Sequence, residues 1–215
     1  AGKRFLPHAR STNEQKDLAN NKPPHSATMA HTTVSQLLEG IDHLSLSSPH
    51  DAGKGMRVQA IRFRGAPLHL KLSDDNDMTV PFEPSSWGGG SETRKSIVFN
   101  IPQPLFEAVA ELEDWCRQVL EDEFPAIQAM WTSSIKPAER YAASLKAKIN
   151  ITGPRPARFY DETAQPTESP TSWKGLRVNA VVLVRGVYIQ KQAIGLMLEV
   201  TDLRYGQPPE PECPF

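Results

Sequence analysis

The sequence predicts a mainly β domain, a small antiparallel barrel or sandwich, with a disordered arm before it and a short tail after it. The prediction rests on about seven strand-like segments, one principal helix and no alternation of strands with helices. Of the 215 residues, 39% are hydrophobic, 7% are aromatic and 19 are proline. Such low apolar and high proline contents indicate a folded part joined to a flexible one.

Residues 1–55 are predicted to form the disordered arm. Residues 1–30 have few large apolar side chains and many Asn, Ser, Thr, Pro and His, so burial cannot offset the entropy lost on ordering. Residues 33–44 differ, because their apolar positions repeat at helical spacing and predict a short amphipathic helix.

The start of this short helix has its own signal, because Thr33 and Gln36 fit a capping box. An isolated amphipathic helix either docks a partner or packs on its own domain, and the sequence leaves both alternatives open. The residues that would contact a partner are Leu37, Leu38 and Ile41.

The folded domain is predicted over residues 56–206. Segments 57–64 and 67–72 read as a hairpin, and further strands are expected at 78–82 and 96–101. The principal helix has Pro104 in its first turn, and its apolar residues are spaced four, three, four and three apart. These residues are Leu105, Val109, Leu112, Cys116 and Val119, so Cys116 is expected to be a packed thiol.

Strands return towards the C-terminus. Residues 145–151 alternate between apolar side chains and Lys or Asn, which predicts one core face and one basic face. Segment 158–160 is expected to be extended, and 176–189 reads as a strand that Gly186 breaks or bulges. The last strand is expected at 193–203.

Catalytic and metal-binding patterns do not emerge. Five of the six histidines lie in the arm without nearby cysteines, which does not favour a metal site. Gly53-Lys54-Gly55 lacks the pattern of a phosphate-binding loop. The helix carboxylates are interpreted as a solvent-exposed face. We therefore expect no enzyme activity, no cofactor and no metal. The longest aliphatic run is far too short for a membrane span, so we expect a soluble intracellular protein without a membrane partner.

The net charge of −1 combines two opposite regions. Residues 96–135 contain seven acids and one base, whereas residues 136–206 contain eleven bases and six acids. The fold is therefore expected to separate an acidic helix from a basic layer of strands.

Basic and aromatic residues are interleaved along the strands, as suits a surface that neutralises phosphates and stacks on unpaired bases. The alternative is that the rings are core residues and the lysines merely face solvent. The candidate nucleic-acid-binding residues are Arg62, Arg64, Lys71, Trp87, Lys146, Lys148, Arg158, Tyr160, Trp173, Lys174, Arg177, Tyr188, Lys191, Arg204 and Tyr205.

A family resemblance adds to this pattern. It is carried by the order of segments 68–72, 80–82, the acidic helix, 141–149, 173–175, 178–184, 186–189 and 195–200. In this order the chain resembles single-stranded-DNA-binding proteins of nucleocytoplasmic large DNA viruses and, more remotely, those of bacteriophages with an OB-fold core. The resemblance covers roughly residues 56–205, and the long arm departs from it.

The resemblance implies an OB-like barrel that binds single-stranded DNA with little sequence preference during replication, recombination or repair. It also implies a location in the nucleus or a viral replication compartment. Two alternatives stay open: an RNA-binding protein, and a protein–protein adaptor built on the same barrel.

The tail, residues 207–215, ends in prolines, two acids and a final Phe215. It is similar to the tail tips of bacterial single-stranded-DNA-binding proteins, which implies docking of replication or recombination enzymes. Phe215 would then fill an apolar pocket of the partner. The alternative is a disordered stub.

Overall fold

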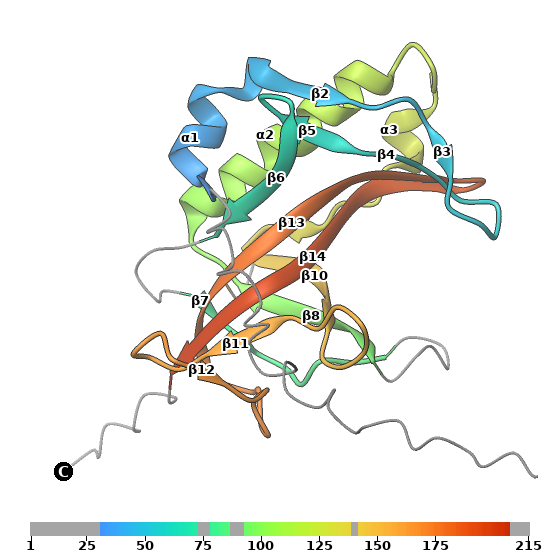
Figure 1. Ribbon diagram of the computed structural model, residues 1–215. Coiled ribbons are helices and arrows are strands. Elements are labelled where there is room, and N and C mark those ends of the chain that lie inside the picture. The colour runs from blue at the N-terminus through green and yellow to red at the C-terminus, as the bar shows by residue number, and fades with distance from the viewer. Residues whose placement is uncertain (1–30, 73–77, 87–92, 139–141, 207–215) are drawn as a thin grey trace, which may run out of the picture.

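Two long strands near the C-terminal end organise the fold. The computed structural model describes residues 31–72, 78–86, 93–138 and 142–206 (Figure 1). In it, β13 (Arg177–Gln190) and β14 (Ala193–Gly206) pair antiparallel along nearly their whole length. This hairpin runs diagonally through the molecule, and the other strands attach to its two edges.

Five strands are paired in a ring. From β14 the pairing continues in parallel to β10 (Ser144–Asn150) and then antiparallel to β8 (Arg94–Asn100). From β8 it passes to β7 (Met78–Thr79), which pairs antiparallel with β13. The pairings therefore return to the hairpin from which they began, and all five strands contribute residues to the common core.

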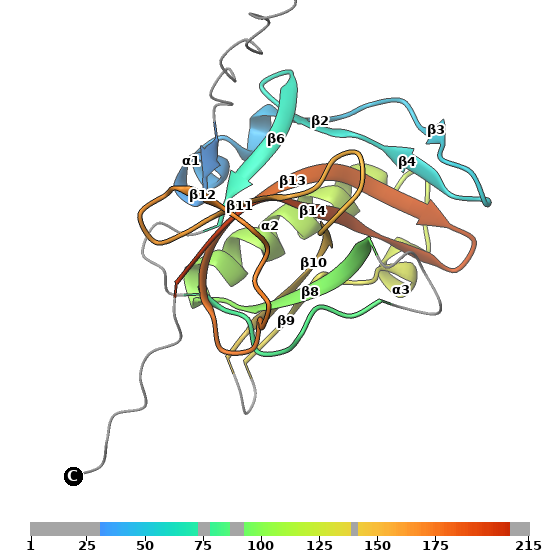
Figure 2. The ribbon, with the colours of Figure 1, turned by 60° about the horizontal axis from the view of Figure 1, so that its bottom comes forward.

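A second group of strands pairs with β13 on the edge that faces away from β14. β6 (Ala66–Lys71) and β4 (Arg57–Gln59) both pair antiparallel with β13, and a bulge at Gly186 separates the two contacts. These strands lie on the opposite side of the hairpin from β8 and β10 (Figures 1 and 2). The remaining strands are β1 (Thr32–Thr33), β2 (Leu44–Leu46), β3 (His50–Asp51), β5 (Ile61–Phe63), β9 (Ile135–Lys136), β11 (Arg158–Tyr160) and β12 (Pro166–Thr167).

The principal helix is α2 (Gln103–Leu120), with Pro104 in its first turn as predicted. Its buried stripe matches the prediction through Cys116 but ends on Leu120, whereas Val119 is 50% exposed. A period of 3.6 residues explains the difference, because after Cys116 the inward direction falls four residues on. A short helix, α3 (Ile127–Met130), follows.

Residues 31–55 pack on the domain, which differs from the predicted arm. Helix α1 (Val34–Glu39) starts with the predicted capping box, in which the Gln36 amide donates to Thr33 Oγ1 (3.3 Å) and the Thr33 amide to Gln36 Oε1 (2.9 Å). Leu37 and Leu44 are buried in the common core. The helix thus packs on its own domain, because α2 and β6 supply the apolar partners that the local composition lacks.

The mainly β character and the principal helix are confirmed. The strands are more numerous than predicted, and segment 57–64 splits at Ala60 into the short strands β4 and β5, whereas β8 and β14 are longer than predicted. The expectation of a purely antiparallel sheet is wrong, because β10 and β11 both pair with β14 in parallel. In the part of the chain that the structure describes, no helix is long and apolar enough to cross a membrane.

Candidate functional site

The outer face of β8 and β10 is polar and basic. The pleat directs Ile97, Phe99 and the apolar residues of β10 into the core, so the residues between them share the outside. The antiparallel register sets Lys146 opposite Val98 and Lys148 opposite Ser96. The predicted division of segment 145–151 into a core face and a basic face is confirmed.

Two clefts cross this face, with volumes of about 950 and 730 Å³. Ser133, Ser134 and Lys146 line both, so the two clefts adjoin, and together they are called the groove below. The first cleft is also lined by Phe82, Ser85, Ser96, Val98, Asn100, Lys136 and Ser144, and the second by Met56, Arg94, Lys148, Arg185, Tyr188, Gln190, Met197 and Glu199.

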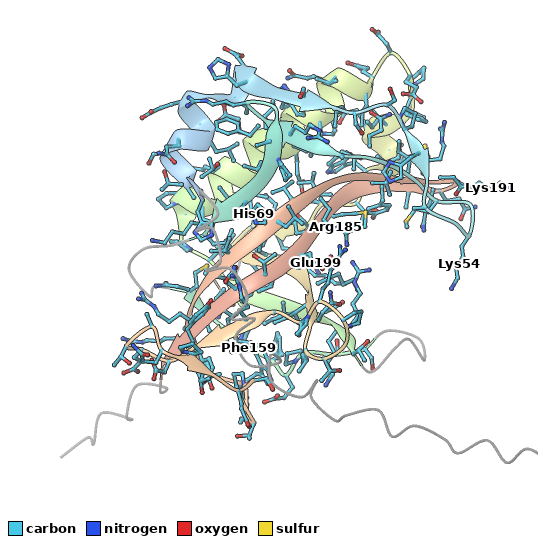
Figure 3. The ribbon with its side chains drawn as sticks, viewed as in Figure 1. Lys54, His69, Phe159, Arg185, Lys191 and Glu199 are labelled. Carbon is cyan, nitrogen blue, oxygen red and sulfur yellow. The ribbon has the colours of Figure 1, made fainter. Side chains whose placement is uncertain are left out.

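The groove is cationic. Its described lining holds five basic side chains against one acid, Glu199, which lies on β14 beside Arg185 of β13 (Figure 3). Glu199 is 13% exposed and accepts hydrogen bonds from Arg185 Nη1 (2.8 Å) and Asn150 Nδ2 (2.9 Å), with Arg94 Nη2 at 3.7 Å. Its charge is therefore balanced locally. The basic residues are Arg94, Lys136, Lys146, Lys148 and Arg185.

Lys148 lies where the positive charges crowd together. Its Nζ donates to Ser96 Oγ at 2.6 Å. Partial burial lowers the pKa of this ammonium group, and the charges of Lys146 and Arg94 lower it further. An anion entering the groove would relieve this repulsion, because opposite charge stabilises the protonated lysine.

Segment 131–136 closes the space between β10 and β14, which pair directly only around Lys148 and Glu199. On one side the Thr132 amide donates to the Ile194 carbonyl (2.7 Å), and on the other the Lys146 amide donates to the Ser134 carbonyl (2.7 Å). The segment thereby brings Ser133 and Ser134 to the middle of the groove.

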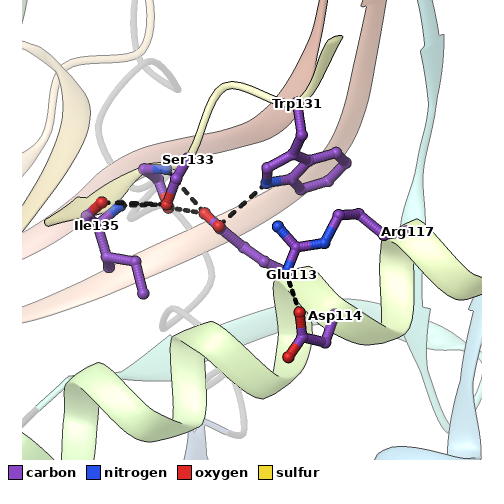
Figure 4. A network of polar contacts seen from close by, with 7 residues as sticks. Glu113, Asp114, Arg117, Trp131, Ser133 and Ile135 are labelled. Atoms are coloured by element: carbon purple, nitrogen blue, oxygen red, sulfur yellow. Dashed lines mark hydrogen bonds and ion pairs between the residues drawn. The ribbon is translucent and has the colours of Figure 1, made fainter. Parts of the chain in front are cut away.

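A buried carboxylate on α2 holds this segment (Figure 4). Glu113 is 2% exposed and accepts three hydrogen bonds, from Trp131 Nε1 (3.0 Å), Ser134 N (2.7 Å) and Ser134 Oγ (2.7 Å). The sequence predicts a solvated face for helix carboxylates such as Glu111 and Asp114. Glu113 departs from it, because its partners lie in a segment that the helical spacing alone does not reveal.

Arg117 supports the same corner from outside. Its guanidinium pairs with Asp114 and lies over the Trp131 ring, 5.6 Å from the centroid. Ser133 Oγ caps the turn by donating to the Ile135 carbonyl (3.0 Å) and accepting from the Ile135 amide (3.1 Å). In the described ranges no cluster of His, Cys, Asp or Glu could hold a metal ion.

Three of the predicted site residues line the groove: Lys146, Lys148 and Tyr188. A second set gathers at the other end of the β13–β14 hairpin, near β11 and β12 (Figure 1). This set consists of Arg158, Tyr160, Trp173, Lys174, Arg177, Arg204 and Tyr205.

Several members of that second set are engaged in the fold. Trp173 is 4% exposed and packs edge-on against Phe159, with ring centroids 5.9 Å apart, so its ring is a core residue. Arg158 pairs with Asp202 at 2.7 Å, and Tyr205 Oη donates to the Glu168 carbonyl at 3.0 Å. For Trp173, the alternative that an aromatic ring belongs to the core is the correct one.

The other predicted residues lie apart from the groove. Arg62 and Arg64 belong to β5 and the turn after it, where Arg62 donates to the Gly65 carbonyl (3.2 Å) and Arg64 lies over the Phe63 ring. Lys71 ends β6, and Lys191 lies at the tip of the hairpin (Figure 3). Trp87 and Phe215 lie outside the described residues. Leu38 and Ile41 are half-buried beside Leu37.

Sequence reasoning missed Arg94, Lys136, Arg185, Phe82 and the serines of segment 131–136. Arg185 carried a usable signal, because it occupies an outward position of the predicted strand 176–189. Arg94 precedes the predicted strand 96–101, and only the longer observed β8 places it on the same face as Ser96.

No protein-family model matches this sequence, and no curated protein is similar to it by sequence. Among solved structures it is similar to gp2.5, a single-stranded-DNA-binding protein encoded by bacteriophage T7, with a TM-score of 0.50 and 9% identity over 69% of this chain and 91% of that chain. The two share a fold. The single-stranded-DNA-binding protein of bacteriophage Enc34, solved with single-stranded DNA, aligns with a TM-score of 0.42 and 12% identity over 79% of this chain and 99% of that one.

The likeness to gp2.5 supports the predicted resemblance to bacteriophage proteins at the level of the fold. The resemblance to proteins of nucleocytoplasmic large DNA viruses stays a prediction.

Proposed function

We propose that the chain binds single-stranded DNA along the groove with little sequence preference. The observation that carries the proposal is the groove itself, in which five basic side chains face one acid that Arg185, Asn150 and Arg94 already engage. The fold shared with gp2.5 supports it. We further infer that the ring of five strands is an OB-type barrel, and that the protein acts in replication, recombination or repair.

The chemistry of the groove suits one unpaired strand. Lys and Arg neutralise phosphates, while the hydroxyls of Ser85 and Ser144 can both donate and accept, so they can pair with any base. A double helix is convex and is bound by elements that protrude into its grooves. A recessed path of this kind instead accommodates a flexible single strand.

The test is fluorescence anisotropy with labelled oligo-dT, duplex DNA and RNA at several salt concentrations. If the strand releases counterions from about five phosphates, its affinity should fall roughly a hundredfold between about 50 and 200 mM salt. Duplex DNA should bind more weakly, and the RNA arm decides whether the groove discriminates between the two kinds of strand. Failure to bind oligo-dT at low salt would contradict the proposal.

Matched charge reversals locate the site. Lys146→Glu combined with Lys148→Glu should abolish binding of oligo-dT, because both side chains line the groove. Arg62→Glu combined with Arg177→Glu makes the same change of charge at exposed strand positions outside both clefts, and should leave most of the affinity. Equal losses from the two pairs would mean that only the overall charge matters and that the groove is misplaced.

A further inference from the structure

Phe82 is an exposed aromatic residue in the wall of the first cleft. Its side chain is 66% exposed, and the other large hydrophobic residue exposed among the described ones is Val119 on α2. Single exposed apolar residues are common on protein surfaces. Phe82 is different because its ring stands in a cleft with the cations Lys136 and Lys146.

The backbone on both sides of Phe82 is fixed. Before it, the Val80 amide donates to the Leu176 carbonyl (3.0 Å), and the Val80 carbonyl accepts from the Gly175 amide (2.8 Å). After it, Ser85 exchanges two hydrogen bonds with Ser96 of β8, at 3.0 and 2.8 Å. Val80 and Pro84 are buried, whereas Phe82 and Glu83 between them are exposed.

Glu83, the next residue, adds a third anchor. One of its carboxylate oxygens accepts from the amides of Trp173 (2.9 Å) and Lys174 (3.2 Å) and from Ser172 Oγ (3.3 Å). The hydrogen bond from the Trp173 amide is the main reason why the pKa of Glu83 is lowered, so the carboxylate stays ionised and keeps these donors. The exposure of Phe82 is therefore imposed by a held backbone.

We propose that Phe82 is a base-stacking residue of the groove, placed to contact an unpaired base while Lys136 and Lys146 bind the adjacent phosphates. The proposal rests on the proposed function and names a contact within that site. A flat ring beside cations matches a polyanion that carries flat bases. An apolar protein segment would bring no negative charge to this cationic cleft.

The test combines a side-chain deletion with a base deletion. The affinities of the full-length chain and of Phe82→Ala are measured for oligo-dT and for an abasic oligonucleotide of the same length. Stacking is worth about 1–3 kcal/mol per base, so Phe82→Ala should lower the affinity for oligo-dT by roughly fivefold to 150-fold. It should leave the affinity for the abasic strand and the slope of the salt dependence unchanged, because the ring contacts no phosphate.

Three further variants serve as controls. Phe82→Tyr and Phe82→Trp keep a flat ring and should retain the affinity for oligo-dT. Val119→Ala removes the other exposed apolar side chain, which lies outside both clefts, and should change nothing. Thermal unfolding of Phe82→Ala should match that of the unsubstituted chain, since an exposed ring contributes little to the core.

The outcomes separate the two proposals. If the unsubstituted chain binds oligo-dT and Phe82→Ala binds it equally well, the stacking role is refuted and the groove stands. An equal loss on oligo-dT and on the abasic strand would also refute stacking, because no base is then involved. If the unsubstituted chain binds neither strand, the proposed function itself fails, and the stacking role fails with it.

Discussion

Replacing Glu113 with glutamine tests how α2 supports the groove. Glutamine has nearly the same shape but turns one carboxylate oxygen into a donor group. In the structure one oxygen accepts from both donors of Ser134 and the other from Trp131 Nε1. Either orientation of the amide therefore leaves donors facing each other, at Trp131 or at Ser134.

The cost follows from these contacts. A hydrogen bond to a charged group contributes about 1.5–3 kcal/mol, and a buried donor left unsatisfied costs about 1–3 kcal/mol. The neutral amide is easier to bury than the carboxylate, which offsets part of the loss. We expect Glu113→Gln to lower the free energy of unfolding by about 2–3 kcal/mol. In a domain of this size, that lowers the Tm by roughly 4–12 °C.

Urea and thermal unfolding of the full-length protein measure this loss. Glu111→Gln is the matched control, because it removes the same charge from an exposed position of the same helix and should change stability by less than about 0.5 kcal/mol. Glu113→Gln should also weaken oligo-dT binding, since Ser134 lines both clefts. Equal stabilities of the two variants would refute the idea that this carboxylate holds segment 131–136.

Three other variants test separate parts of the structure. The lowered pKa of Lys148 means that this side chain loses its proton at a lower pH than an ordinary lysine. The affinity for oligo-dC should therefore begin to fall early as the pH becomes alkaline. Lys148→Arg, whose guanidinium stays protonated, should retain its affinity over the same pH range. Burial raises the pKa of the Cys116 thiol and shields it from reagents. In a Cys213→Ser background, a thiol reagent should therefore label the protein only when denaturant unfolds it. Rapid labelling of the native state would contradict the packing of Cys116. Gly186→Ala should lower the free energy of unfolding in urea by about 2–4 kcal/mol, because φ is +146° and the added Cβ would lie 2.8 Å from Ala60 Cα. The control Gly53→Ala, at φ +84° in open space, should lower it by about 1 kcal/mol. Equal losses would mean that crowding at the bulge is unimportant.

The features that the sequence predicted well are local. The two faces of β10, the stripe of α2, the capping box at Thr33 and the interruption at Gly186 each depend on residues within a few positions of one another. Such patterns reflect the periods of strands and helices, which a single sequence displays directly.

The features that it missed depend on partners far away along the chain. Trp173 looked like a ring available to bases, but Phe159 and the core enclose it. Glu113 looked like one more solvated acid, but its partner Ser134 is 21 residues away. The apolar pattern of residues 33–44 predicts a helix but leaves its partner open, because the contacts that hold α1 come from α2 and β6. In each case the deciding contact is tertiary.

The number of charged residues in a segment predicts that a basic surface exists, whereas the fold decides which basic side chains share that surface. The excess of bases over residues 136–206 correctly indicated a basic surface, but sequence segments do not decide which bases share a face. The pleat and register bring Arg94 of β8 to Lys148 of β10, whereas Arg158, from the basic segment, pairs with Asp202 at the far end of the hairpin. If the proposed function is right, an added polyanion gains more in the groove, where five cations face one acid, than beside Arg158, whose charge Asp202 already balances.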